Sequence, residues 1–181
     1  MAERVLLTGI SGYIGQHCAA ELLNQGFEVV GTIRSQSKAD ATRAAIAAVA
    51  PVENLTFVEA DLLSDDGWDA AMSGCSYVVH VASPFVIAEP KDENELIIPA
   101  VEGTQRVVSA AQRAGVQRMV LTSSIFAMVA GRPTGRYGPD TWSDVNVGPR
   151  ASTVQPSARG PFASKHRCRG FLCALSGLFP E

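Results

Sequence analysis

A glycine-rich turn close to the N-terminus constrains this chain more than any other feature of its sequence. The segment Thr8–Gly15 reads TGISGYIG, with glycines in the spacing G-x-x-G-x-x-G. It follows the apolar run Val5–Leu7, typical of a buried strand, and precedes apolar residues at helical spacing. Such a turn lets the backbone approach a dinucleotide pyrophosphate, whose charge faces the helix N-terminus. The alternative interpretation is an ordinary turn, because glycine alone is a weak signal.

The end of the next expected strand bears on which dinucleotide is bound. Residues 27–33 (FEVVGTI) are typical of a strand, and Arg34 follows where NAD-preferring folds usually carry Asp or Glu. A guanidinium at this point can bind the 2′-phosphate of NADP through two hydrogen bonds. Lys38 and Arg43 are further basic candidates for the same phosphate. The pattern favours NADP over NAD; the alternative is a solvated arginine at a strand end.

Length and composition exclude several classes of protein. The 181 residues suffice for one domain with a real core, and 46% of them are hydrophobic. The net charge of −3 argues against a broad affinity for nucleic acid. No apolar run has the length of a membrane span and no signal peptide is expected, so we predict a cytoplasmic protein. The four cysteines and three histidines lack the spacing of a zinc site, so we expect no metal.

Strand and helix patterns alternate as far as about residue 125. Helices are expected over residues 37–49, 65–72 and 95–114, and further strands over residues 55–59, 77–81 and 118–122. Strands separated by helices form right-handed βαβ units. We therefore predict an α/β fold of the Rossmann type, a doubly wound parallel sheet with strand order 3-2-1-4-5.

The amino-acid composition of the sequence changes after residue 130. Residues 131–160 are rich in Gly, Pro, Ser, Thr and Arg and lack apolar periodicity, which is typical of a functional loop or of disorder. We expect a nucleotide-binding domain over residues 1–148 and a divergent basic tail, rich in Pro, Ser and Arg, over residues 149–181. The sequence does not indicate an oligomeric state.

Several segments form a recognisable combination when they are taken together. They are TGISGYIG (8–15), VVGTIRS (29–35), Asp61–Leu62, HVASPF (80–85), PAVEGTQRVVSAA (99–111), VLTSS (120–124) and Trp142-Ser143-Asp144. In this combination, over residues 3–148, the chain resembles the extended short-chain dehydrogenases/reductases of the NAD-dependent epimerase/dehydratase superfamily. It is most similar to the dihydroflavonol-reductase-like branch, which includes cinnamoyl-CoA reductases.

The resemblance implies NADP(H) as the cofactor and a small-molecule carbonyl compound as the substrate. The cofactor-binding residues that it implies are Gly9, Ser11, Gly12, Tyr13, Ile14, Gly15, Arg34, Lys38, Asp61, Leu62, Val81, Ala82, Ser83, Thr122 and Ser123. Arg34 would meet the 2′-phosphate, and Asp61 and Leu62 would lie near the adenine. No nucleic-acid or membrane partner is implied.

The chemistry of the family is hydride transfer from NADPH to a carbonyl group. A serine hydroxyl binds the carbonyl, a tyrosine donates the proton, and a lysine four residues later in Y-x-x-x-K lowers the tyrosine pKa. A phenol with a pKa near 10 needs such help near neutral pH, and a neighbouring ammonium favours the phenolate. Ser124 matches the serine and Lys165 matches the lysine, so both are catalytic candidates.

The chain departs from the family pattern at the proton donor. Pro161 stands four residues before Lys165, and none of Tyr13, Tyr77 and Tyr137 has a lysine four residues later. The family also normally continues with a substrate domain. These departures suggest a truncated, alternatively spliced or frameshifted product. Three hypotheses remain open: an NADP-dependent carbonyl or ketone reductase, an NADP-binding module without turnover, and a fragment without function.

Overall fold

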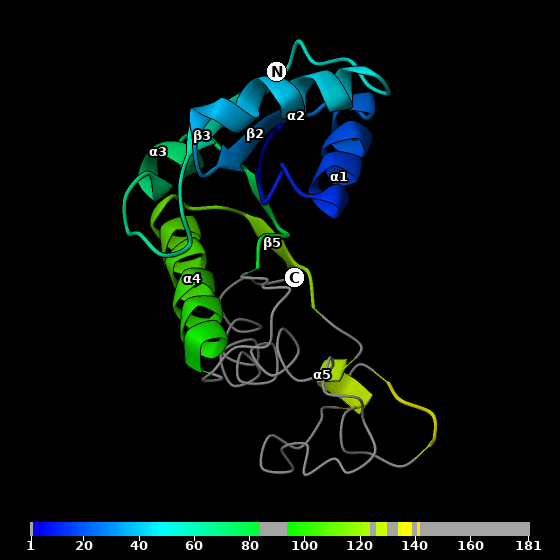
Figure 1. Ribbon diagram of the computed structural model, residues 1–181, viewed down its shortest axis with the longest axis vertical. Coiled ribbons are helices and arrows are strands. Elements are labelled where there is room, and N and C mark those ends of the chain that lie inside the picture. The colour runs from blue at the N-terminus through cyan, green and yellow to red at the C-terminus, as the bar shows by residue number, and fades with distance from the viewer. Residues whose placement is uncertain (1, 84–93, 124–125, 130–133, 139–140, 142–181) are drawn as a thin grey trace. The chain divides into compact units, whose positions relative to one another are not determined.

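The computed structural model describes residues 2–83, 94–123, 126–129, 134–138 and 141 (Figure 1). The elements run in the order β1 (Arg4–Thr8), α1 (Tyr13–Asn24), β2 (Glu28–Ile33), the 3-10 turn η1 (Gln36–Lys38), α2 (Ala39–Ala47), β3 (Leu55–Glu59), α3 (Trp68–Met72), β4 (Tyr77–His80), α4 (Asn94–Arg113), β5 (Arg118–Leu121) and α5 (Phe126–Val129). Strands and helices alternate in the way that the sequence pattern predicts.

The chain divides into two compact units. The first comprises Met1–Ser83 and Gly103–Thr122 and contains all five strands of the sheet. The second comprises Pro84–Glu102 and Ser123–Glu181, with the first part of α4 and the short helix α5. The boundary expected between residues 148 and 149 lies outside the described residues and stays a prediction.

The sheet has the predicted topology. Its five strands are parallel and lie in the order β3-β2-β1-β4-β5. Leu6 at the centre of β1 pairs with Val30 of β2 on one side and with Val78 of β4 on the other. The strand order reverses between β1 and β4, and in such sheets ligands bind at the carboxyl ends of the strands beside this reversal. The Rossmann-type fold is confirmed.

The central strand is buried on both faces. Val5, Leu6 and Leu7 are at most 1% exposed, as in a parallel sheet that helices cover on both sides. On one face, α1 and α2 pack against the sheet through a cluster consisting of Leu7, Ile10, Ala19, Leu23, Val29, Ile33, Ala39, Ile46 and Leu55. In Figure 1, α3 and the last part of α4 lie on the opposite side of the sheet from α1 and α2.

Helix boundaries differ from the sequence expectation by more than one residue at two places. The helix expected over residues 65–72 begins only at Trp68, because Gly67 has a left-handed backbone (φ 83°) that no helix continues through. The helix expected over residues 37–49 is divided into η1 and the shorter α2. The backbone conformation of Gly67 decides the first difference, and apolar periodicity does not report it.

Candidate nucleotide-binding site

The residues expected to bind the cofactor follow the carboxyl ends of neighbouring strands. The glycine turn follows β1, Arg34 follows β2, Asp61 lies two residues beyond the end of β3, and Val81 follows β4. Because the strands are parallel, these segments lie along one edge of the sheet within the first unit. The topology thus gathers residues that are far apart in the sequence.

Gly9 is the residue at which the chain turns out of β1. Its backbone is left-handed (φ 71°), and a Cβ placed on it would lie 2.9 Å from the backbone nitrogen and the Cα of Ala82. Only glycine satisfies both conditions at low cost. Gly9 therefore allows the segment after β4 to approach the turn after β1, which brings Ala82 to the candidate site.

The third glycine of the motif, Gly15, serves the packing of α1. It is buried, and a Cβ on it would collide with the carbonyl oxygen of Gly9 and lie 2.8 Å from the Cα of Ile10. Ile10 is fully buried and packs over Gly31 of β2, where a Cβ would meet its side chain at 2.5–3.1 Å. The turn is thus held against both the helix that follows it and the neighbouring strand.

The N-terminus of α1 presents backbone donors without a protein cap. Gly12 is the N-cap residue and provides no side chain, and the first turn contains no acidic residue. The N–H of Gln16 bonds to the carbonyl of Gly12 at 3.0 Å, so the N–H groups of Tyr13, Ile14 and Gly15 have no intrahelical acceptor. Ser11, Gly12, Tyr13 and Ile14 are exposed. Uncapped N–H groups and the positive end of the helix dipole suit a pyrophosphate.

Thr8 connects the carboxyl ends of the two central strands. Its Oγ1 accepts the backbone N–H groups of Val81 at 3.1 Å and Ala82 at 3.0 Å. The hydroxyl hydrogen is therefore available for Nδ1 of His80, 2.7 Å away. Thr8 and His80 are both at most 1% exposed. His80, which appears isolated in the sequence, is thus a structural partner of the first motif residue.

The basic residues expected at the 2′-phosphate have different environments. Arg34 and Lys38 are exposed, and Ser35 between them bonds to Ser37 through their hydroxyl oxygens at 2.9 Å. Arg43 donates from Nη1 to the carbonyl of Val52 at 3.1 Å and from Nη2 to that of Leu55 at 2.9 Å. It also stacks over Phe57, 5.2 Å from the ring centroid.

These contacts correct the expectation for Arg43. Its guanidinium joins α2 to the start of β3, and the carbonyl groups that it satisfies would lose their donor if it turned to a phosphate. Arg34 and Lys38 remain as the basic candidates. The sequence could not separate the three, because it shows charge but not the partner of each charge.

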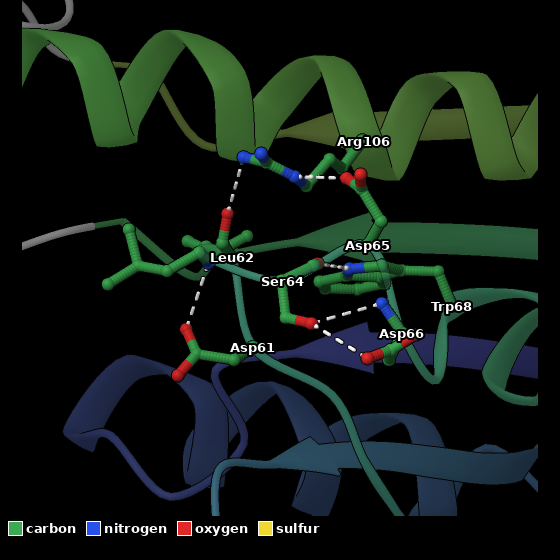
Figure 2. A network of polar contacts seen from close by, with 8 residues as sticks. Asp61, Leu62, Ser64, Asp65, Asp66, Trp68 and Arg106 are labelled. Atoms are coloured by element: carbon green, nitrogen blue, oxygen red, sulfur yellow. Dashed lines mark hydrogen bonds and ion pairs between the residues drawn. The ribbon is translucent and has the colours of Figure 1, made fainter.

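Asp61 and Leu62 begin a tightly bonded loop after β3 (Figure 2). Oδ1 of Asp61 accepts the backbone N–H of Leu63 at 3.0 Å, and the carbonyl of Leu62 accepts Nη1 of Arg106 at 3.0 Å. Both Asp61 and Leu62 are half-buried. Sequence reasoning missed Arg106, which lies in the segment PAVEGTQRVVSAA but 44 residues from its partner.

The remaining expected residues fall into two groups. Val81 and Ala82 are half-buried, whereas Ser83, Thr122 and Ser123 are exposed. The N–H of Thr122 bonds to the carbonyl of His80 at 3.0 Å, which continues the pairing of β5 with β4. Ser124 and Lys165, the two catalytic candidates, lie outside the described residues, as does Pro161. Their roles stay predictions.

The donor set fits a dinucleotide phosphate better than it fits a metal ion. The turn offers backbone N–H groups, and a Cβ at Gly9 or Gly15 would close the space that brings the backbone segments together. Within the described part of the chain, no group of three or more His, Cys, Asp and Glu residues could hold a metal. In those same residues no helix combines the length and the apolar character needed to cross a bilayer.

Comparison with known proteins agrees with the fold and the motif. Residues 5–152 match the model of the NAD dependent epimerase/dehydratase family. A dihydroflavonol 4-reductase of Hordeum vulgare is 35% identical over 144 residues, which are 78% of this chain and 41% of the relative. A ketoreductase of Cercospora nicotianae is 34% identical over 169 residues, covering 89% of this chain and 46% of the relative. The chain thus spans less than half the length of these relatives.

Solved structures give the same architecture. Vestitone reductase from Medicago sativa superposes with a TM-score of 0.75 at 26% identity, covering 97% of this chain and 53% of that protein. The NADPH complex of Gre2 from Candida albicans gives a TM-score of 0.77 at 23% identity, over 95% of this chain and 53% of that protein. With the family model matching most of its length, this chain belongs to the NAD-dependent epimerase/dehydratase family.

Proposed function

We propose that this chain binds NADP(H) at the carboxyl edge of its sheet and acts as the cofactor-binding part of a carbonyl or ketone reductase. The observation that carries the proposal is the uncapped N-terminus of α1, which follows a glycine turn beside the reversal of strand order. Two relatives support the reaction class: one is named a dihydroflavonol 4-reductase, at 35% identity, and the other a ketoreductase, at 34% identity.

Each part of the site has a distinct task in this proposal. The N–H groups at the start of α1 bind the pyrophosphate, because Gly12 leaves the approach to them open. Arg34 binds the 2′-phosphate, since its exposed guanidinium follows β2 and matches phosphate geometry. Asp61 accepts a hydrogen bond from the amino group of adenine. When bound, NADPH supplies the hydride for reduction of a carbonyl group.

A second candidate function is NADP(H) binding without efficient turnover. The sequence observation that favours it is the absence of a Tyr-x-x-x-Lys motif: Pro161 stands where the family carries the proton donor. A positioned general acid contributes roughly 10²–10⁴-fold to such a reaction. Ser124 alone would bind a carbonyl oxygen without delivering a proton.

Direct titration tests the binding proposal. NADPH fluorescence is followed as the 181-residue chain is added, with NADH as the matched ligand that lacks only the 2′-phosphate. We expect saturable binding of NADPH that is tighter than that of NADH. Equal affinity for both would remove the 2′-phosphate from the proposal, and no saturation with either would reject nucleotide binding. NADPH oxidation with aromatic and aliphatic aldehydes then separates the reductase from the binding module.

A further inference from the structure

The loop between β3 and α3 is held in place from a helix that is distant in sequence. We call residues 60–67 the adenosine loop. It begins beside the end of β2. The N–H of its first residue, Ala60, bonds at 3.0 Å to the carbonyl of Ile33, which is the residue before Arg34. The loop therefore starts next to the proposed phosphate-binding arginine, where the adenosine half of NADP(H) would lie.

Contacts inside the adenosine loop define its shape (Figure 2). The N–H of Ser64 bonds to the carbonyl of Asp61 at 3.1 Å, and Nε1 of Trp68 donates to the carbonyl of Ser64 at 3.0 Å. Trp68 is only 2% exposed, so this bond joins the loop to the core. At its end, Gly67 lies so close to the carbonyl oxygen of Glu59 that any Cβ would collide with it.

Arg106 of α4 supplies the external restraint. Its Nη1 donates to the carbonyl of Leu62 at 3.0 Å, and its Nε forms an ion pair with Oδ1 of Asp65. The Arg106 side chain is 22% exposed, whereas that of Asp65 is 85% exposed. The bond to the Leu62 carbonyl is therefore the better shielded of the two, and it contributes more than the ion pair.

One turn earlier on the same helix, Gly103 brings α4 against the same residue. A Cβ at Gly103 would lie 2.7 Å from Cβ of Leu62, so glycine there permits the approach that Arg106 exploits. Residues three apart share one helix face. Leu62 is thus restrained at its side chain by Gly103 and at its carbonyl by Arg106, both within the first unit.

The geometry points to Arg106 as a positioning residue for recognition of the adenine ring. In Figure 2 the carboxylate of Asp61 and the guanidinium of Arg106 lie on opposite sides of the loop. One oxygen of Asp61 accepts the N–H of Leu63, and the other is available for an N–H donor such as the adenine amino group. Arg106 would not touch the nucleotide, but it fixes the peptide group between Leu62 and Leu63, whose N–H bonds to the Asp61 carboxylate. This inference rests on the proposed function.

The test compares two nucleotides that differ only at the adenine ring. NADPH carries the amino group, whereas reduced nicotinamide hypoxanthine dinucleotide phosphate carries an oxygen in its place. The ratio of their Kd values measures recognition of that group and is insensitive to a general loss of stability. In the unmodified chain we expect NADPH to bind at least about tenfold more tightly, on the scale of one hydrogen bond to a charged group.

The chain offers a matched control on the same helix. Arg113, two turns after Arg106, forms an exposed ion pair at 2.6 Å with Asp69, which lies in α3 and outside the adenosine loop. Arg106→Ala should lower the Kd ratio to about twofold or less, whereas Arg113→Ala should leave it unchanged. Asp65→Ala should also leave it nearly unchanged, because the Leu62 carbonyl keeps its donor.

The outcomes separate this inference from the proposed function. An equal loss of affinity for both nucleotides in Arg106→Ala, with the ratio unchanged, would overturn the positioning role. A ratio near one in the unmodified chain would overturn it as well, while leaving NADP(H) binding intact. Failure of the unmodified chain to bind NADPH would overturn the proposed function itself. If Arg106→Ala does not fold, Arg106→Lys, which loses the planar two-donor geometry, should give an intermediate ratio, and an unchanged ratio would count against the role.

Discussion

Thr8 and His80 are 72 residues apart in sequence, yet Oγ1 of Thr8 lies 2.7 Å from Nδ1 of His80 in the buried centre of the sheet. The hydroxyl already accepts two backbone N–H groups, so it donates its own hydrogen to the imidazole. Nδ1 is therefore an acceptor, and the proton of the neutral ring resides on Nε2. The pair aligns the ends of β1 and β4, where the glycine turn meets Ala82.

Removal of this hydroxyl should be costly. Thr8→Val removes the hydrogen-bond partner of Nδ1 in buried His80 and of the half-buried N–H groups of Val81 and Ala82, so we expect the free energy of unfolding to fall by roughly 2–4 kcal/mol. Thr32→Val is the control, because Thr32 makes a single longer contact of 3.4 Å with the N–H of Gly9. Urea denaturation measures both, and equal losses would contradict a special role for Thr8. Long-range ¹H–¹⁵N spectra should show the Nε2–H tautomer of His80.

Replacing either of two motif glycines, Gly12 or Gly15, with alanine should have different effects on stability and on NADPH affinity. At Gly12 (φ −81°), among the residues that the structure describes, an added Cβ would closely approach only the carbonyl oxygen of Gly9, at 3.3 Å. Gly12→Ala should therefore fold with a loss below about 1 kcal/mol but bind NADPH at least about tenfold more weakly, because the methyl group enters the phosphate approach.

Gly15→Ala should affect stability more than NADPH affinity. Its Cβ would collide with the Gly9 carbonyl, so we expect a loss of stability of about 1–3 kcal/mol from overpacking. Thermal unfolding and NADPH titration of both variants make the comparison. A stable Gly15→Ala chain, or a Gly12→Ala chain with undiminished affinity, would show that the roles of the two glycines are assigned wrongly.

Arg34 should control the preference between the two cofactors. Arg34→Ala removes a charge-assisted contact, worth on the order of 1.5 kcal/mol or about tenfold in Kd, from NADPH but not from NADH. The measurement is the ratio of the two Kd values. Arg43→Ala is the control: it removes structural bonds to Val52 and Leu55, so stability should fall while the ratio persists. A ratio that responds to Arg43 and not to Arg34 would reverse the assignment.

The chain should bind NADPH but oxidise it only slowly. We expect little NADPH oxidation with aldehydes, because Pro161 cannot donate a proton at the position of the family tyrosine. Pro161→Tyr alone should restore little activity, since positioning of the substrate contributes several kcal/mol beyond the proton donor. Robust turnover that is lost in Ser124→Ala would contradict this expectation. Tyr137 would then be the first residue to test as the proton donor.

Cys75 should make the free energy of unfolding depend on pH in the alkaline range. Burial raises the pKa of its thiol above the ordinary value of 9.0, a change that Arg4 partly opposes and Glu28 reinforces. The folded state therefore favours the neutral thiol, so this stabilisation is present below about pH 9 and is lost as the pH rises through the folded pKa. Urea midpoints between about pH 8 and pH 10.5 should fall more steeply for the unmodified chain than for Cys75→Ser. Parallel pH profiles would contradict the assignment.

The amino-acid sequence alone was sufficient for the sheet and for the turn at its centre. Apolar runs separated by helical patterns predict the five strands, and the glycine turn typical of dinucleotide-binding folds predicts the order 3-2-1-4-5, which is the one observed. The glycine spacing predicts the turn after β1, because left-handed backbone at Gly9 and close packing at Gly15 are local demands that only glycine meets. Such features are encoded by neighbouring residues, so a linear pattern reports them.

Tertiary structure decided which polar groups are partners. Arg34 and Arg43 are equivalent as charges in the sequence, but only Arg43 is engaged by the carbonyl groups of Val52 and Leu55. His80 acquires its role from Thr8, and the adenosine loop is held by Arg106 across 44 residues. Hydrogen bonds depend on the direction and distance of single atoms, which are set only when the helices pack on the sheet. For that reason the sequence identified the candidate site but not the residues that hold it in shape.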